Sequence, residues 1–446
     1  MKKILAFILV IIAVANVNGQ PSRPNLDSLM NFYAAEYNFN GVAFISWKGD
    51  IMLDKGYGYR DIGNGIKNDE NSIFMIGSNT KQFTSELILQ LAMQQKLGVQ
   101  DLLSKYFPDY KNGNKITLEN LLTHTSGIYN YTDDSTWQGH PADPISEEKL
   151  LSLFRDKELL FEPGSKFEYS NSNYILLGCI IEMVTGKTYQ QVIRDNILTP
   201  LGMVHTGFDY IHLQDKNKAT GYYTIQGDKY NQAPLADSTT TFAAGSMYAD
   251  VADMYKWHKA LQSYKLLPKE WQEKAFVPFK GKYGYGWFAD TGYGKKLVGH
   301  SGGVPGFYTY EMRVPEDDVC ILLFQNCEMP AMDNNTICKK ILSCMYDANY
   351  KLPQSKKAVE VSSEILLQYA GVYNVTKDFS ITITVKGDEL YAQGTDQDDF
   401  KINSESETKF YSKEVGAEIE FKKDEKGKVE KLILTQGGQK IPAIRI

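Results

Sequence analysis

Hydrophobic spacing divides the chain into a mixed helix-and-strand part and a later all-strand part. Apolar runs at 42–45 and 51–53, joined by the turn residues Lys48-Gly49-Asp50, predict a β-hairpin. From Ser78 to Leu97 apolar side chains recur on one face of a helix, and Gly98 follows as a stop. The remaining expected elements are helices and loops over about 100–240, helices over 249–261 and 333–346, and strands over 284–288, 308–314 and 319–324.

Residues 349–363 interrupt this pattern. They contain Pro353 and two adjacent lysines with few apolar side chains, which is typical of a linker. Beyond them, short alternating segments are separated by turns such as Lys386-Gly387-Asp388, which predicts a small all-β barrel or sandwich over 364–446. The clearest strand segments are 381–385, 390–392, 410–411, 419–421 and 432–434.

The N-terminus has the pattern of a secretory signal peptide. Lys2 and Lys3 precede an almost unbroken apolar run over 4–14, and small or polar residues follow at 18–20. The run is too short to span a bilayer, which favours a cleaved signal over the alternative of a retained anchor. We therefore expect residues 1–19 to be removed and the mature protein to be periplasmic or secreted, with no membrane span.

Composition and charge narrow the choice of function. The 446 residues are 43% hydrophobic and 23% charged, enough for two or three globular units, and the net charge of −6 gives no indication of nucleic-acid or anionic-membrane binding. Five cysteines leave at least one free thiol and leave a single disulfide open. Their spacing shows no metal pattern, and we expect neither a metal nor a cofactor.

A candidate nucleophile lies at the start of the first predicted helix, in Ser78-Asn79-Thr80-Lys81. Residues three apart on a helix share a face, so the Lys81 amine can take the Ser78 proton once burial lowers its pKa. The helix N-terminus would also stabilise an oxyanion. Taken alone, the tetrapeptide favours a purely structural interpretation, with a helix-capping serine and a surface lysine.

Two further segments contain suitable partners. In Tyr169-Ser170-Asn171 the phenol could relay protons, with a pKa depressed by a cationic lysine, and the amide could bind a substrate amide. In His300-Ser301-Gly302-Gly303 the glycines would let a strand edge approach a ligand, and a backbone N–H could donate to an oxyanion. A half-buried tyrosine in a turn and a simple glycine-rich turn are the structural alternatives.

In this order and spacing, the three motifs resemble the serine β-lactamase and penicillin-binding protein superfamily. The likeness is greatest to its branch of class C β-lactamases, DD-peptidases, D-aminopeptidases and esterases, and it covers about 30–345, including 116–127, 199–203 and 283–287. It implies an α/β fold over 20–348, with an antiparallel sheet flanked by helices and a helical insertion at about 100–240. The unit from about 364 resembles the lipocalin-like barrels of some relatives.

The resemblance also implies a role for each motif. Ser78 would be acylated, Lys81 would be its base, and Tyr169 would relay protons. Asn171 would hold the substrate amide, and His300-Ser301-Gly302 would stand at the Lys-Thr-Gly triplet of the family. The backbone N–H groups of Ser78 and Gly303 would form the oxyanion hole, and His124 would be structural. Because His300 replaces a permanent cation and Gly303 replaces a hydroxyl residue, a dedicated β-lactamase is disfavoured.

These expectations define a serine hydrolase that cleaves an amide or ester through an acyl-Ser78 intermediate. The partner would be a small peptide, ester or β-lactam, with D-residue peptides expected first by family analogy. An esterase or weak β-lactamase is the alternative enzyme. A non-catalytic protein that binds penicillin or peptidoglycan fragments is the alternative of another class. In relatives with such a barrel, the barrel can contribute to oligomerisation, so a homo-oligomer stays an open alternative.

Overall fold

The computed structural model describes residues 23–134, 142–226, 229–328, 332–413, 415–436 and 439–446. The signal peptide expected at 1–19 lies outside the described residues and stays a prediction. None of the helices in the described ranges has the length and apolar character to cross a membrane.

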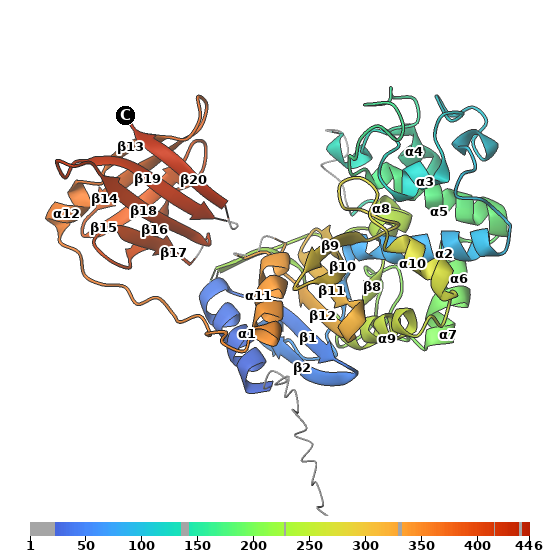
Figure 1. The fold of residues 1–446 in the computed structure, drawn as a ribbon, viewed down its shortest axis with the longest axis horizontal. Coiled ribbons are helices and arrows are strands. Elements are labelled where there is room, and N and C mark those ends of the chain that lie inside the picture. Colours follow the sequence, from blue (N-terminus) through green and yellow to red (C-terminus); the bar gives the residue numbers. More distant parts are fainter. Residues whose placement is uncertain (1–22, 135–141, 227–228, 329–331, 414, 437–438) are drawn as a thin grey trace, which may run out of the picture.

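A six-stranded antiparallel sheet forms the centre of the larger part of the molecule (Figure 1). Its strand order is β2-β1-β12-β11-β10-β9, so the N-terminal hairpin pairs with the last strand of this part. The strands are β1 Gly41–Trp47, β2 Asp50–Tyr57, β9 Phe288–Gly292, β10 Lys295–Val304, β11 Phe307–Val314 and β12 Val319–Gln325.

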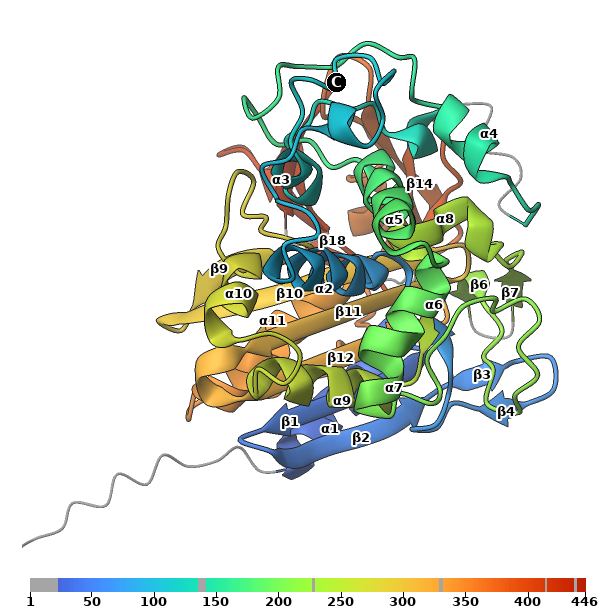
Figure 2. The same cartoon turned by 90° about the vertical axis from the view of Figure 1, so that its right-hand side faces the viewer.

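Helices cover both faces of this sheet (Figures 1 and 2). Ile321 and Leu323 of β12 belong to the core cluster that includes α1 and α11, whereas Leu322 belongs to the cluster on the α2 side. Because both faces are covered, every residue of β12 is buried. The covering helices are α1 Arg23–Tyr37 and α11 Asn334–Tyr346 on one face, and α2 Thr80–Met93, α9 Val251–Gln262 and α10 Lys269–Ala275 on the other.

A helical region packs beyond α2 and carries part of the site. The centre of α5 is buried from Ser172 to Ile181, and the helix ends at Gly186 with a left-handed φ of 68°. The helices here are α3 Leu118–Leu122, α4 Glu147–Ser152, α5 Asn171–Thr185, α6 Tyr189–Ile193, α7 Thr199–Leu201 and α8 Ser238–Gly245. The short strands are β3 Tyr59–Asp61, β4 Ile66–Lys67, β5 Phe74–Met75, β6 Tyr222–Gln226, β7 Lys229–Gln232 and β8 Tyr248–Ala249.

The C-terminal unit is a closed barrel of eight antiparallel strands. Its interior is filled by side chains, among which the rings of Tyr369 and Phe421 stack at 4.0 Å. α12 Ser363–Leu367 precedes the strands β13 Gly371–Asn374, β14 Ser380–Lys386, β15 Glu389–Gly394, β16 Phe400–Ser404, β17 Lys409–Ser412, β18 Ala417–Lys423, β19 Val429–Gln436 and β20 Gln439–Arg445.

The fold class expected from the sequence is confirmed, with two local differences. The expected helix from Ser78 to Leu97 is shorter at both ends: a 3₁₀ turn over Gly77–Asn79 precedes α2, and α2 ends at Met93. The strand expected at 284–288 begins only at Phe288. Gly286 has a φ of 79°, and a Cβ there would lie 2.6 Å from Ser85 Oγ, so this segment is a turn held closely against α2. All five cysteines are buried, and none forms a disulfide.

Candidate active site

The Ser78 turn lies directly against β10, because neither partner has a side chain at the contact. A Cβ on Gly77, whose φ is 51°, would lie 2.8 Å from Gly303 N. A Cβ on Gly302 would lie 1.9 Å from Ile76 O. The two glycines therefore bring the backbone of Gly303 beside Ser78, where both N–H groups can serve one oxyanion. A Cβ on Gly303 itself would meet no atom within 4 Å among the residues of the structure.

Lys81, in the first turn of α2, has three oxygen neighbours. Its Nζ lies 3.0 Å from Ser78 Oγ, 2.8 Å from Asn171 Oδ1 and 2.8 Å from the carbonyl oxygen of Ala244. The side chain is fully buried, and burial lowers its pKa well below the ordinary value. A neutral amine has two N–H donors and one lone pair. It can donate to Asn171 and Ala244 while accepting the Ser78 hydroxyl proton, which is the geometry of a general base.

Tyr169 hydrogen-bonds Ser78, and its ring centroid is 4.9 Å from Lys81 Nζ. The sequence suggested that a cationic lysine would depress the pKa of this phenol, and that expectation is wrong. Burial raises the pKa of Tyr169, and the Ser78 hydrogen bond opposes this only in part. Because Lys81 is itself biased towards the neutral form, it offers no fixed charge to stabilise a phenolate. Tyr169 is therefore a protonated donor at neutral pH.

His124 packs beneath Tyr169, with ring centroids 4.2 Å apart. Its Nδ1 accepts from the Ser170 backbone N–H at 3.2 Å and lies 3.2 Å from Asn173 Nδ2. Burial and the nearby Lys81 lower its pKa well below the ordinary value. The ring is thus a neutral support that holds the loop on which Tyr169 is carried.

Asn171, the first residue of α5, is fixed on three sides. Its Oδ1 accepts from Lys81, its backbone N–H donates to Asn130 Oδ1 at 2.9 Å, and its Nδ2 lies 3.4 Å from Thr132 Oγ1. The contact with Lys81 gives this residue a role in orienting the base. Its predicted contact with a substrate amide stays a prediction.

His300 is buried and carries no charge at neutral pH. Tyr283 OH donates to its Nε2 at 2.9 Å, and its Nδ1 donates to the carbonyl oxygen of Ser301. Burial and Lys81 lower the pKa of His300 to about 3. With 1% of its surface exposed, the ring offers a substrate carboxylate neither charge nor access. Ser301 is half-buried and pairs with Tyr310 of β11, one residue before the glycine that contacts the Ser78 turn.

Several residues that complete this site have no signal in the sequence. The Ala244 carbonyl follows Phe242, whose φ of 35° and ψ of −130° are strained for a non-glycine residue. This kink turns two carbonyls towards α2, since Thr84 Oγ1 donates to Ala243 O at 2.7 Å. The pattern of side chains along the sequence does not show which backbone carbonyls will accept hydrogen bonds. For Tyr283 the sequence showed only its place in the segment 283–287, and its contact with His300 was not predicted.

The described residues contain one group that could hold a cation, made of His205, Asp250 and Asp253. Its atoms already bond one another or their neighbours. Asp250 caps the start of α9, and Asp253 accepts from the His205 backbone at 2.7 Å and pairs with Lys256. The group lies apart from Ser78 and contributes nothing to the site.

Comparisons with known proteins agree with this geometry. A family model described as beta-lactamase matches residues 26–337, and one described as a domain of unknown function (DUF3471) matches 355–442. A penicillin-binding protein of Bacillus subtilis (strain 168) is 26% identical over 451 residues, which cover 96% of this chain and 99% of that protein.

Solved structures extend the likeness to the whole chain. An octameric penicillin-binding protein homologue from Pyrococcus abyssi superposes with a TM-score of 0.67 and 27% identity, covering 95% of this chain and 99% of that one. A D-amino acid amidase from Ochrobactrum anthropi SV3 has a TM-score of 0.63 and 20% identity over 73% of this chain and 99% of its own, which shows a shared fold.

Proposed function

Because this chain belongs to the β-lactamase family, whose members are serine hydrolases, we propose that it is an exported enzyme that cleaves an amide or ester through an acyl-Ser78 intermediate. The observation that carries this proposal is the buried Lys81 amine, 3.0 Å from Ser78 Oγ with two other acceptors in place. Export is supported by the signal-peptide pattern at residues 1–19.

Acylation begins when Ser78 Oγ attacks the carbonyl carbon and its proton passes to the lone pair of Lys81. The carbonyl oxygen becomes an oxyanion, which the N–H groups of Ser78 and Gly303 stabilise. When the tetrahedral intermediate collapses, Tyr169 protonates the leaving group and recovers a proton from Lys81. The high pKa of Tyr169 suits this step, because the phenol holds the proton that the leaving group needs.

Deacylation reverses these roles. A water molecule attacks the acyl-Ser78 ester, its proton passes to the Tyr169–Lys81 pair, and Ser78 Oγ is reprotonated as it leaves. Apart from the substrate and this water molecule, these steps use only groups of the chain itself. A non-catalytic penicillin or peptidoglycan-fragment receptor is the alternative of another class, and the complete proton path through Lys81 and Tyr169 weighs against it.

The proposed substrate is a peptide with D-residues. The D-amino acid amidase shares the fold, and the Bacillus relative is a penicillin-binding protein. An esterase or weak β-lactamase is the second candidate. The neutral, buried His300 supplies no cation for the β-lactam carboxylate. It therefore favours a peptidase, an esterase or a weak β-lactamase over an efficient β-lactamase. The octameric homologue supports the further proposal that this protein forms a homo-oligomer.

The test is a substrate panel on wild type and Ser78→Ala. It contains matched D- and L-residue peptide amides, p-nitrophenyl esters and a chromogenic cephalosporin. We expect Ser78-dependent hydrolysis of esters and D-residue amides, with slow turnover of the cephalosporin. Equal hydrolysis of D- and L-amides would overturn the substrate class. Unchanged activity in Ser78→Ala would overturn the mechanism.

A further inference from the structure

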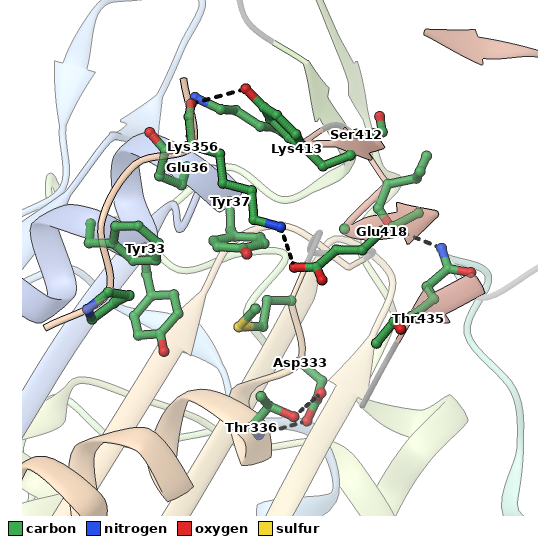
Figure 3. A pocket seen from close by; sticks show the side chains of 18 of the residues that line it. Tyr33, Glu36, Tyr37, Asp333, Thr336, Lys356, Ser412, Lys413, Glu418 and Thr435 are labelled. Atoms are coloured by element: carbon green, nitrogen blue, oxygen red, sulfur yellow. Dashed lines mark hydrogen bonds and ion pairs between the residues drawn. The ribbon is translucent and has the colours of Figure 1, made fainter. Parts of the chain in front are cut away.

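Two threonine hydroxyls on opposite faces of the central sheet make contacts of different reach. Thr336 of α11 lies in the wall of a cavity of about 640 Å³ between the catalytic part and the barrel. Its hydroxyl donates at 2.6 Å to Asp333, the capping residue of the same helix (Figure 3). Thr309 of β11 is 0% exposed on the α2 face. Its hydroxyl contacts both the Ser78 turn and β10, so it can act beyond its own strand.

The Thr309 hydroxyl has an acceptor on each side of the proposed oxyanion hole. Its Oγ1 lies 3.0 Å from the carbonyl oxygen of Ile76, which immediately precedes the Ser78 turn. It also lies 3.3 Å from the carbonyl oxygen of Gly302, the residue before Gly303. A hydroxyl has a single proton, which these two carbonyl oxygens share. Thr309 therefore ties the segment that carries the nucleophile to the strand that carries the second N–H donor.

The missing side chain of Gly302 makes room for this hydroxyl. Thr309 and Gly302 lie opposite each other in the β10–β11 register. A Cβ on Gly302 would lie 2.8 Å from Thr309 Oγ1 and 1.9 Å from the carbonyl oxygen of Ile76. The hydroxyl thus fills the narrow space between the sheet and the turn. A methyl group in its place would face two carbonyl oxygens without bonding either, and both would lose a buried donor.

Asn79, the last residue of the Ser78 turn, orients the hydroxyl from the other side. Its Nδ2 donates to Thr309 Oγ1 at 2.9 Å, and its Oδ1 accepts from Gln82 Nε2 at 3.1 Å. Gln82 Oε1 in turn accepts from Trp257 Nε1 at 2.9 Å. An indole N–H can only donate, so Gln82 must direct its NH₂ group to Asn79. Asn79 is then left with its own NH₂ group towards Thr309, which turns the hydroxyl proton to the carbonyls.

We propose that Thr309 is a positioning residue for the oxyanion hole: its hydroxyl fixes the spacing between the N–H groups of Ser78 and Gly303. The inference rests on the proposed function and adds to it a residue that acts without contact with the substrate. Two N–H groups stabilise one oxyanion only when both reach it at hydrogen-bond distance. Thr309→Val keeps a similar shape but removes the hydroxyl, so it should let the turn and β10 separate while Lys81 stays in place.

The test compares p-nitrophenyl acetate with p-nitrophenyl thionoacetate, in which sulfur replaces the carbonyl oxygen. Both release p-nitrophenolate, which leaves without a proton. Sulfur is a weak hydrogen-bond acceptor, so an oxyanion hole favours the oxygen ester. The kcat/KM of each substrate, divided by its rate constant with hydroxide in solution, gives an oxygen preference. For wild type we expect a preference of at least about 10²-fold, the worth of one oxyanion donor.

Thr309→Val should lower kcat/KM for the oxygen ester by about 10- to 100-fold and for the thionoester by less than about threefold. Thr309→Ser keeps the hydroxyl and should stay within about threefold of wild type on both substrates. The matched control is Thr336→Val, which loses a hydroxyl hydrogen bond on the other face of the sheet and should keep the wild-type oxygen preference.

Asn79→Ala is the second variant, because it removes the donor to Thr309 and leaves the hydroxyl in place. It should lower the oxygen preference in the same direction by a smaller factor, and it decides the matter if Thr309→Val misfolds. Urea unfolding shows which variants are folded.

Three outcomes would overturn the inference. They are equal losses of Thr309→Val on the two substrates, which would mean a merely structural role, a Thr309→Ser as impaired as Thr309→Val, and a wild-type oxygen preference in either Thr309→Val or Asn79→Ala. In each case wild type would still hydrolyse the oxygen ester through Ser78. Absence of that hydrolysis would instead refute the proposed function.

Discussion

The barrel and the catalytic part both have apolar interiors, but only the interior of the catalytic part also encloses the ionisable side chains of Lys81 and Glu311. The barrel interior is a continuous apolar cluster around Tyr369, Phe410 and Phe421. The space between α2 and the central sheet also has apolar neighbours, but it encloses Lys81 and Glu311, both 0% exposed. Among the described residues, neither carboxylate oxygen of Glu311 has a hydrogen-bond partner at normal distance and angle, although the nearby Gln82 side chain favours the carboxylate.

This difference means that the buried ionisable groups of the catalytic part contribute to catalysis at a cost in stability. Burying an ionisable group without a full set of partners costs free energy, so these side chains are not present to stabilise the catalytic part. The same burial lowers the pKa of Lys81 and makes its amine a base. The catalytic part therefore gives up stability for reactivity, whereas the barrel interior is built for stability alone. Substitutions in the two regions should have separable effects.

The largest effect is expected at the nucleophile and its base. Ser78→Ala and Lys81→Met should each lower kcat/KM for esters by about 10⁴-fold or more, because the first removes the attacking oxygen and the second removes the amine that takes its proton. Lys81→Met should not lower the free energy of unfolding, since an apolar side chain of similar length replaces a buried amine. Steady-state kinetics measures the change in kcat/KM, and urea unfolding measures the change in the free energy of unfolding. Lys96→Met, an exposed lysine, is the control. A strongly destabilised Lys81→Met would break the comparison.

The second-largest effect on activity is expected for Tyr169→Phe. It removes the donor to the leaving group, so amide turnover should fall by about 10²–10⁴-fold. Activated esters should suffer less in acylation, because p-nitrophenolate leaves without a proton. Pre-steady-state kinetics on a matched amide and ester separates the steps. Equal losses on both substrates would mean that Tyr169 positions the site or acts only in deacylation.

In the barrel the expected effect is on stability alone. Phe421→Ala removes a buried ring that stacks on Tyr369, and it should lower the free energy of unfolding of the barrel by about 3–5 kcal/mol. Hydrolysis of p-nitrophenyl acetate should remain, because the ring has no contact with Ser78. Urea unfolding monitored by fluorescence, together with the ester assay, checks both. Loss of ester hydrolysis at denaturant concentrations where the catalytic part is folded would contradict the separation.

The smallest effect concerns pH. Burial raises the pKa of Glu311 to about 7, against an opposing effect of Arg313 and Gln82. A carboxyl whose pKa is raised on folding stabilises the fold below its unfolded pKa, and this stabilisation is lost as pH rises towards 7 and beyond. Glu311→Gln should therefore be more stable than wild type at pH 8.5 by on the order of 2 kcal/mol, with little difference at low pH.

Urea unfolding at pH 4.5 and pH 8.5 measures this difference. Glu425→Gln, at an exposed barrel residue, is the matched control. His300, opposite Glu311 in the β10–β11 register, stays neutral over this range because its pKa is about 3, so it does not obscure the result. A Glu311→Gln variant that is less stable than wild type at pH 8.5 would show that the carboxylate has a partner.

Sequence reasoning predicted the elements whose pattern is set locally. The hairpin of β1 and β2 and the helices α9 and α11 follow from hydrophobic spacing and turn residues. The strand predicted over 284–288 was wrong for most of its length, because glycines and aromatic residues in this order also suit a strand. Only the packed structure shows that Gly286 is a turn against Ser85.

The site was predictable where it depends on side chains within one motif. Ser78 and Lys81 are found by their spacing, and His300 was expected to be mostly neutral. The Ala244 carbonyl depends on a kink at Phe242, which no sequence rule anticipates. The pKa of Tyr169 was predicted with the wrong sign, since the charge of Lys81 was assumed and its burial was not yet known.

The central claim is that Ser78 is acylated with a neutral Lys81 as its base. Peptide mass spectrometry after timed treatment with a fluorophosphonate tests it most directly, on wild type, Ser78→Ala and Lys81→Met. The account predicts a single adduct on Ser78 in wild type, none in Ser78→Ala, and labelling slowed by about 10²-fold or more in Lys81→Met. An adduct on another serine, or Lys81→Met labelled at the wild-type rate, would contradict it.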